Sequence, residues 1–174
     1  MKRLVVLLAV LMLSGAAAFA QTTDSHGINF TLTESALIDL DSDADLDFAL
    51  SLSANPADAG LPPTGGPYTG TRYLYYTVLS EDTNPRIQAS LDSDLPAGLT
   101  LSLTATLGAG GAGTQGVAGA IAAADSTARD LITGIGSCYT GRAPDGTAVA
   151  YDLTMLNYTG TSITRTLTYT ISGW

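Results

Sequence analysis

Five aspartates at alternate positions form the densest group of chemistry-bearing side chains in this sequence: Asp39, Asp41, Asp43, Asp45 and Asp47. Carboxylate oxygens are the ligands that Ca²⁺ prefers, and this ion accepts them in irregular geometry. The series departs from the EF-hand loop, because its sixth position is alanine instead of glycine and its twelfth is leucine instead of glutamate.

Two interpretations of this acidic series remain open. Alternate carboxylates on an extended strand point the same way about 6–7 Å apart, which is too far for close chelation of one ion. A turn within the series would bring several together and create a calcium site at Asp39, Asp41, Asp43 and Asp45. Alternatively, the series is a solvated acidic edge that prevents pairing with another sheet. Of the two, the sequence favours the solvated acidic edge. Calcium is the only cofactor that the sequence suggests.

A cluster of tyrosines around Leu74 offers a second kind of chemistry, the stacking of aromatic rings against a sugar. Side chains alternate between the faces of a strand, so Tyr73 and Tyr75 share one face while Leu74 and Tyr76 share the other. If Leu74 marks the buried face, Tyr73 and Tyr75 point outward and provide a ligand-binding platform. If Tyr73 and Tyr75 are themselves core residues, the platform does not exist.

Nucleophilic catalysis finds little support in the residue types present. His26 is the only histidine and Cys138 the only cysteine, and the residues before Cys138 lack the G-x-S-x-G pattern of a nucleophile elbow. The segment 108–113 matches a glycine-rich dinucleotide pattern, but no helix is predicted after it to bind a phosphate. We therefore expect a protein that is not an enzyme, with a buried Cys138 and no disulfide.

The elements that carry these residues are predicted to be strands. Even-numbered positions from Ile28 to Leu52 are mostly apolar, a period of two that is typical of strands with one buried face, with a turn expected near Asp41 to Asp45. Further strands are expected over residues 72–80, 87–91, 99–107, 128–135, 149–155 and 163–171. Short strands separated by Gly, Pro and Asp turns predict an all-β fold, an antiparallel, immunoglobulin-like β-sandwich of about seven to nine strands.

The first twenty residues are predicted to be a cleaved signal helix. Lys2 and Arg3 precede the apolar run Leu4 to Leu13, and Ala18-Phe19-Ala20 has the small residues that signal peptidases require. The apolar run is shorter than the roughly 20 residues that span a bilayer, so no membrane span is expected after its removal. Residues 21–174 are then a single secreted domain of the periplasm, the cell surface or the extracellular space.

The charge of this expected mature chain restricts its partners. Without Lys2 and Arg3 it has no lysine, five arginines and 16 acidic residues, a formal charge of −11. Affinity for phosphate comes mainly from lysine and arginine, so we expect no binding to nucleic acid or to anionic membranes.

Taken together, these features resemble the secreted, pilin-like β-sandwich subunits of Gram-negative bacterial fimbriae. The resemblance rests on the signal peptide, the Thr- and Ala-rich strands, the closing strand 164–171 and the apolar alternation of Ile28, Phe30 and Leu32. The chain departs from that family in having one cysteine instead of a pair, and Gly173 instead of a penultimate tyrosine. The resemblance implies assembly by strand addition, in which Ile28, Phe30 and Leu32 complete the sheet of another copy or of another surface subunit. The alternative function is an extracellular module that binds carbohydrate or calcium.

Overall fold

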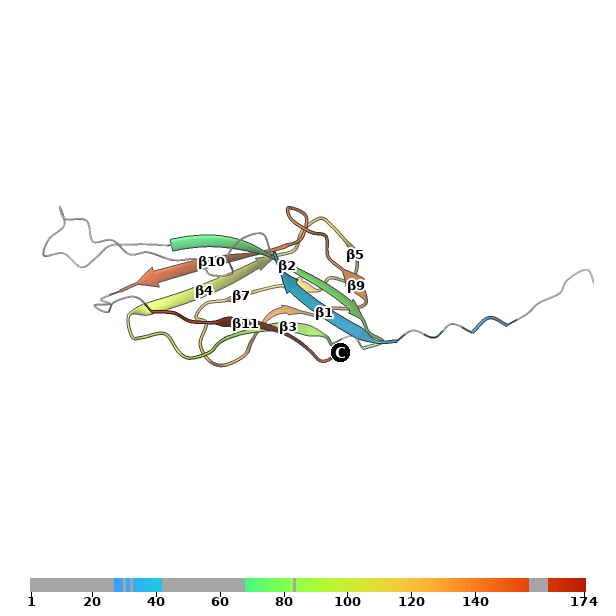
Figure 1. The fold of residues 1–174 in the computed structure, drawn as a ribbon, viewed down its shortest axis with the longest axis horizontal. Coiled ribbons are helices and arrows are strands. Elements are labelled where there is room, and N and C mark those ends of the chain that lie inside the picture. Colours follow the sequence, from blue (N-terminus) through green and yellow to red (C-terminus); the bar gives the residue numbers. More distant parts are fainter. Residues whose placement is uncertain (1–26, 30, 32, 42–67, 83, 157–162) are drawn as a thin grey trace, which may run out of the picture. The chain divides into compact units, whose positions relative to one another are not determined.

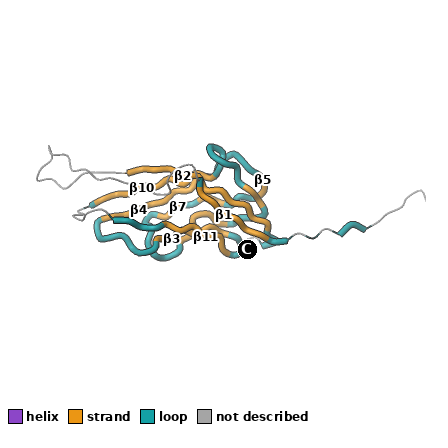
Figure 2. Tube along the Cα trace, viewed as in Figure 1, coloured by secondary structure: helices purple, strands orange, loops and turns teal. Residues whose placement is uncertain are grey.

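The computed structural model describes residues 27–29, 31, 33–41, 68–82, 84–156 and 163–174. These residues contain strands and loops but no helix, as Figures 1 and 2 show. The strands are β1 (Ser35–Leu40), β2 (Tyr68–Leu79), β3 (Arg86–Leu91), β4 (Leu99–Thr106), β5 (Ala112–Gly113), β6 (Val117–Ala118), β7 (Ala120–Ile121), β8 (Arg129–Thr133), β9 (Cys138–Tyr139), β10 (Thr147–Met155) and β11 (Leu167–Ser172). All of them belong to one compact unit, Leu32–Trp174.

The strands form two antiparallel sheets, which confirms the predicted β-sandwich. The larger sheet, sheet A, has seven strands in the order β5-β9-β2-β10-β4-β7, and β1 pairs with the other edge of β2. The smaller sheet, sheet B, has four strands in the order β11-β3-β8-β6. Figure 1 shows β11 and β3 beneath the long strands of sheet A.

The core lies between the sheets and follows the alternation of the sequence. On β2, the even-numbered Leu74, Tyr76 and Val78 are at most 2% exposed, while the odd-numbered residues between them are half-buried. Period-two burial places one face of each strand in the core. The other sheet contributes mainly branched aliphatic side chains: Ile87, Leu91, Leu131 and Ile132.

One lateral side of the sandwich is closed by the backbone. Val117 pairs with β8 of sheet B, and Ile121, four residues later, pairs with β4 of sheet A. Between them, Gly119 donates to Leu131 O at 2.8 Å and accepts from Ala105 N at 3.0 Å. A single short segment therefore joins the two sheets by hydrogen bonds along this side.

The glycine-rich stretch after β4 has a structural role instead of a phosphate-binding one. Gly111 has a φ of +81°, and a Cβ there would lie 1.9 Å from the carbonyl oxygen of Tyr139. A Cβ on Gly108 would lie 2.0 Å from that of Asp145. Only glycine permits such close backbone approach, so this stretch packs directly against β9 and the loop between β9 and β10.

Four two-residue strands, β5, β6, β7 and β9, lie outside the stretches that the sequence predicted to be strands. Cys138 of β9 is buried as predicted, and burial raises the pKa of its thiol. The predicted second strand of the first alternation, together with Asp43, Asp45 and Asp47, lies outside the described residues.

Candidate functional site: an open strand edge and the outer face of sheet A

The side of the sandwich formed by β1 and β11 differs from the closed side. The core-facing side chains of both strands are only partly buried: Ala36, Ile38 and Leu40 on β1, and Leu167, Tyr169 and Ile171 on β11. Their counterparts on the adjacent strands, β2 and β3, are at most 4% exposed. We call this side, made of β1 and β11, the open edge.

The open edge arises because the two sheets differ in width. Five strands follow one another across sheet A, from β1 through β2, β10 and β4 to β7, whereas sheet B has four. The two sheets are joined by hydrogen bonds on the side where β7 and β6 lie. Sheet A therefore extends one strand further than sheet B on the opposite side, where β1 lies. The last strand of sheet B, β11, lies beside β1 in Figure 1 and contacts it.

Within the part of the chain that the structure describes, β11 pairs with β3 alone. The carbonyl of Thr166 accepts from Asp92 N at 2.9 Å, so the even-numbered residues of this strand direct their backbone groups toward β3. In an antiparallel pair the intervening residues direct theirs to the opposite side. The N–H and C=O groups of Leu167, Tyr169 and Ile171 therefore face the open edge.

A pair of tyrosines links the two sheets next to the open edge. The hydroxyls of Tyr151 on β10 and Tyr169 on β11 lie 2.6 Å apart and share a hydrogen bond. Burial is the main cause that raises the pKa of both phenols. The hydrogen bond between these neutral phenols links β11 to sheet A, so β11 is held to both sheets.

Of the three predicted assembly residues, only Ile28 is described. Its side chain is 63% exposed, in a segment that belongs to a unit separate from the sandwich (Met1–Thr31). Phe30 and Leu32 lie outside the described residues. The assembly role of all three stays a prediction.

Two of the four predicted calcium ligands are described, and they are not gathered with other acidic groups. Asp39 lies on β1, where its Oδ1 accepts from Leu40 N at 2.9 Å, and Asp41 follows β1, donating its backbone N–H to Tyr73 O. No cluster of three metal-ligating side chains occurs among the described residues. Asp43 and Asp45 are not described, so the calcium site stays a prediction.

The orientation of Tyr73 and Tyr75 follows the first of the two alternatives drawn from the sequence. Leu74 is fully buried, so Tyr73 and Tyr75 are on the outer face of sheet A, each half-buried. Tyr75 already has partners: its hydroxyl accepts from Ala143 N at 3.1 Å, and the guanidinium carbon of Arg142 lies 5.2 Å from its ring centre. Tyr75 thus holds the loop between β9 and β10, and Tyr73 is the more available ring.

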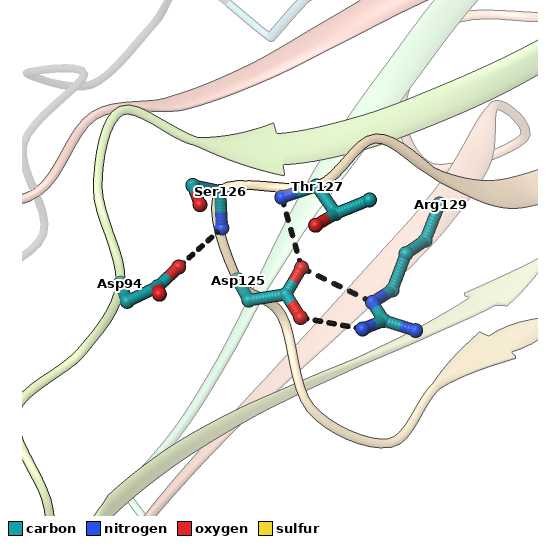
Figure 3. A network of polar contacts seen from close by, with 5 residues as sticks. All are labelled: Asp94, Asp125, Ser126, Thr127 and Arg129. Atoms are coloured by element: carbon teal, nitrogen blue, oxygen red, sulfur yellow. Dashed lines mark hydrogen bonds and ion pairs between the residues drawn. The ribbon is translucent and has the colours of Figure 1, made fainter.

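A polar network joins the loop between β3 and β4 to the loop between β7 and β8 and to Arg129 of β8 (Figure 3). Asp94 accepts from Ser126 N at 2.8 Å, and Asp125 accepts from Thr127 N at 2.9 Å and pairs with Arg129. These hydrogen bonds lower the pKa of both carboxyl groups, that of Asp94 through Ser126 and that of Asp125 mainly through Arg129. The sequence predicted turns in this region but not the contact of Asp94 with Ser126, which is distant along the chain.

Arg165 extends the same network toward β11. Its guanidinium donates to the carbonyl of Asp94 from both Nε and Nη2, each at 3.2 Å. The start of the open edge is therefore tied to the loop between β3 and β4.

Among the residues described, no helix is long and apolar enough to cross a membrane. No protein-family model, curated protein or solved structure matches this chain.

Proposed function

We propose that this chain is an exported, non-enzymatic structural protein of the cell surface that assembles by strand addition. The single observation that supports this proposal is the open edge, where the inner side chains of β1 and β11 are only partly buried. A strand added beside β11 would widen sheet B by one strand. It would cover the apolar side chains of β1, which sheet B now covers only in part. The backbone groups of Leu167, Tyr169 and Ile171, which face the open edge, would pair with that strand.

The added strand is the N-terminal segment of a second copy. Ile28, Phe30 and Leu32 have the spacing of two that places three apolar side chains on one face of a strand. Burying three such side chains contributes roughly 5–9 kcal/mol before the cost of ordering the segment, at about 1.5–3 kcal/mol for each. That range suits association between copies if backbone hydrogen bonds add to it.

Folding back onto β1 through a two-residue turn would not serve this purpose. A two-residue turn at Thr33 and Glu34 would place Phe30 opposite Leu37, and directly opposite residues share a face of the sheet. Leu37 lies on the outer face, where it is 69% exposed. The hairpin would therefore leave the inner face of β1 uncovered, whereas a segment from a second copy has no such restriction.

Two versions of the chain test the proposal by size measurement. The first begins at Gln21, and the second begins at Thr33, which retains β1 and Glu34, whose Oε1 accepts from Glu81 N at 3.0 Å. We expect concentration-dependent oligomers of the first and a monomer of the second in analytical ultracentrifugation. A synthetic peptide of residues 21–33 should bind to the shorter version in calorimetry.

Matched charge substitutions identify the face of the segment that is responsible. The double substitution Ile28→Asp and Phe30→Asp should abolish the oligomers, because it places two carboxylates against the apolar inner face of β1. Asn29→Asp with Thr31→Asp adds the same charge on the opposite face and should leave assembly within about threefold. A longer version that stays monomeric at every concentration, or equal effects of both double substitutions, would reject strand addition.

A further inference from the structure

Trp174 lies at the end of the sandwich where β1 begins, which we call the donor end. Glu34, directly before β1, accepts from Glu81 N at 3.0 Å, in the loop between β2 and β3. A Cβ on Gly173 would lie 2.9 Å from the carbonyl oxygen of Asn84 in the same loop. Figure 1 places the mark C at this end. Trp174 is 50% exposed, and it is the only tryptophan of the sequence.

The opposite end, which we call the far end, exposes two large apolar side chains. β10 ends beside the start of β2, whereas β1 begins beside the end of β2. Leu156, 72% exposed, follows β10, and its backbone N–H donates to Gly98 O at 2.7 Å. Ile163, 38% exposed, lies two residues before Arg165, whose guanidinium donates to Asp94 O. Leu156 and Ile163 are therefore both close to the loop between β3 and β4.

Strand addition would bring the donor end of one copy to the far end of the next. Ser35, the first residue of β1, is three residues after Leu32, a separation of at most about 11 Å. The edge that receives the segment must therefore lie close to the donor end of the donating copy. Every strand pair among the described residues is antiparallel, and antiparallel pairing is the more stable kind. A segment antiparallel to β11 leaves the receiving copy where β11 begins, beside the end of β3, which is the far end.

We propose that Trp174 of the copy that donates a strand packs against Leu156 and Ile163 of the copy that receives it. This inference rests on the proposed strand addition and adds a second contact between the same two copies. Burying an exposed indole ring against two aliphatic side chains removes apolar surface from water. Tryptophan is enriched among the residues whose truncation weakens protein interfaces most.

The fluorescence of the single tryptophan tests this contact. In the version that begins at Gln21, the emission of Trp174 should move to shorter wavelength as oligomers form with rising concentration, and acrylamide should quench it less. The complex of the version that begins at Thr33 with the peptide of residues 21–33 is the reference, because the peptide fills the edge without bringing a second sandwich. The shift in the oligomers should exceed the shift in this complex.

Substitutions at both ends test the same contact by ultracentrifugation. Trp174→Ala should weaken assembly about tenfold, and Leu156→Ala should weaken it to a smaller extent. The double substitution should weaken assembly by less than the product of the two single effects, since the two side chains share one contact. The matched control is Val117→Ala, which removes a 69% exposed apolar side chain from the closed side and should assemble as the unsubstituted protein does.

Binding of the peptide separates this contact from strand addition itself. In the version that begins at Thr33, Trp174→Ala should bind the peptide with unchanged affinity, which also shows that it is folded. Absence of oligomers would reject strand addition, and this contact with it. Oligomers whose emission shifts no more than in the peptide complex, or equal assembly of Trp174→Ala and Val117→Ala, would reject the contact and leave strand addition in place.

Discussion

At the scale of single residues, the hydroxyls of three tyrosines form hydrogen bonds in the interior. Tyr76 is 2% exposed and its hydroxyl donates to the carbonyl of Gln115 at 2.6 Å, which ties the glycine-rich stretch to the core. Tyr151 and Tyr169 bond to each other across the two sheets. Each phenol thus connects segments that the backbone ladders leave separate.

The substitution Tyr169→Phe tests the hydrogen bond between the sheets. Losing it should lower the free energy of unfolding by about 1 kcal/mol, the usual net contribution of one such bond. Urea denaturation measures the change, and Tyr139→Phe, which alters an exposed ring, should stay within about 0.5 kcal/mol of the unsubstituted protein. In a double-mutant cycle with Tyr151→Phe, additive effects would contradict a direct interaction between the two hydroxyls.

At the scale of elements, the loops at one end of the sandwich are held by carboxylates instead of apolar contacts. Asp94 and Asp125 accept backbone N–H groups of the loop between β7 and β8, and Arg129 and Arg165 complete the network. The sequence predicted β3 and β4, which flank one of these loops, but it missed β7, which precedes the other. Polar contacts between loops have no period in the sequence, and so they could not be predicted.

This network predicts a loss of stability in acid. The pKa of Asp94 and that of Asp125 lie below the ordinary value of 3.8 in the folded protein. A lowered pKa stabilises the fold above that ordinary value, and the contribution disappears as the pH falls below it. The urea midpoint of the unsubstituted protein should therefore exceed that of Asp125→Asn at neutral pH, and the two should converge in acid.

The control for this prediction is Asp92→Asn, which removes an exposed carboxylate from the same end of the sandwich. Its midpoint should follow that of the unsubstituted protein throughout. A difference between the unsubstituted protein and Asp125→Asn that is constant at every pH would show that ionisation of Asp125 does not contribute.

At the scale of the whole molecule, the sequence predicted the fold class and most of the long strands. β4 was predicted over residues 99–107 and is observed as Leu99–Thr106, because its apolar and polar residues alternate without interruption. β5, β6, β7 and β9 were missed, since a strand of two residues has no period to detect. Of the two orientations of Tyr75 that the sequence left open, the outward one is observed, but its contact with Arg142 depends on a loop distant in sequence and could not be predicted.

The buried tyrosines together predict a loss of stability in alkali. Burial raises the pKa of Tyr76 to about 12 from an ordinary value of 10.0, and it raises the pKa of Tyr151 and of Tyr169. A raised pKa of an acid means that the unfolded chain releases its proton first, so the free energy of unfolding should decline as the pH rises above 10. Stability below that pH should not depend on these groups.

Absorbance of ionised tyrosine, followed together with circular dichroism during an alkaline titration, measures this effect. Part of the tyrosine signal should appear only as the strands unfold, and Tyr76→Phe should reduce the slope of stability against pH. Complete ionisation of all tyrosines in a protein that keeps its strand spectrum would contradict the prediction.

The unequal width of the two sheets has a consequence for how copies would associate. In strand addition, the segment that is donated and the edge that receives it are different surfaces. Each addition would therefore leave one unused N-terminal segment and one unoccupied open edge in the product. Such a contact does not close on itself as a two-fold dimer does. It generates a filament whose two ends differ and whose length is not fixed by the contact. Termination would then need a cap: a subunit that accepts a strand but donates none.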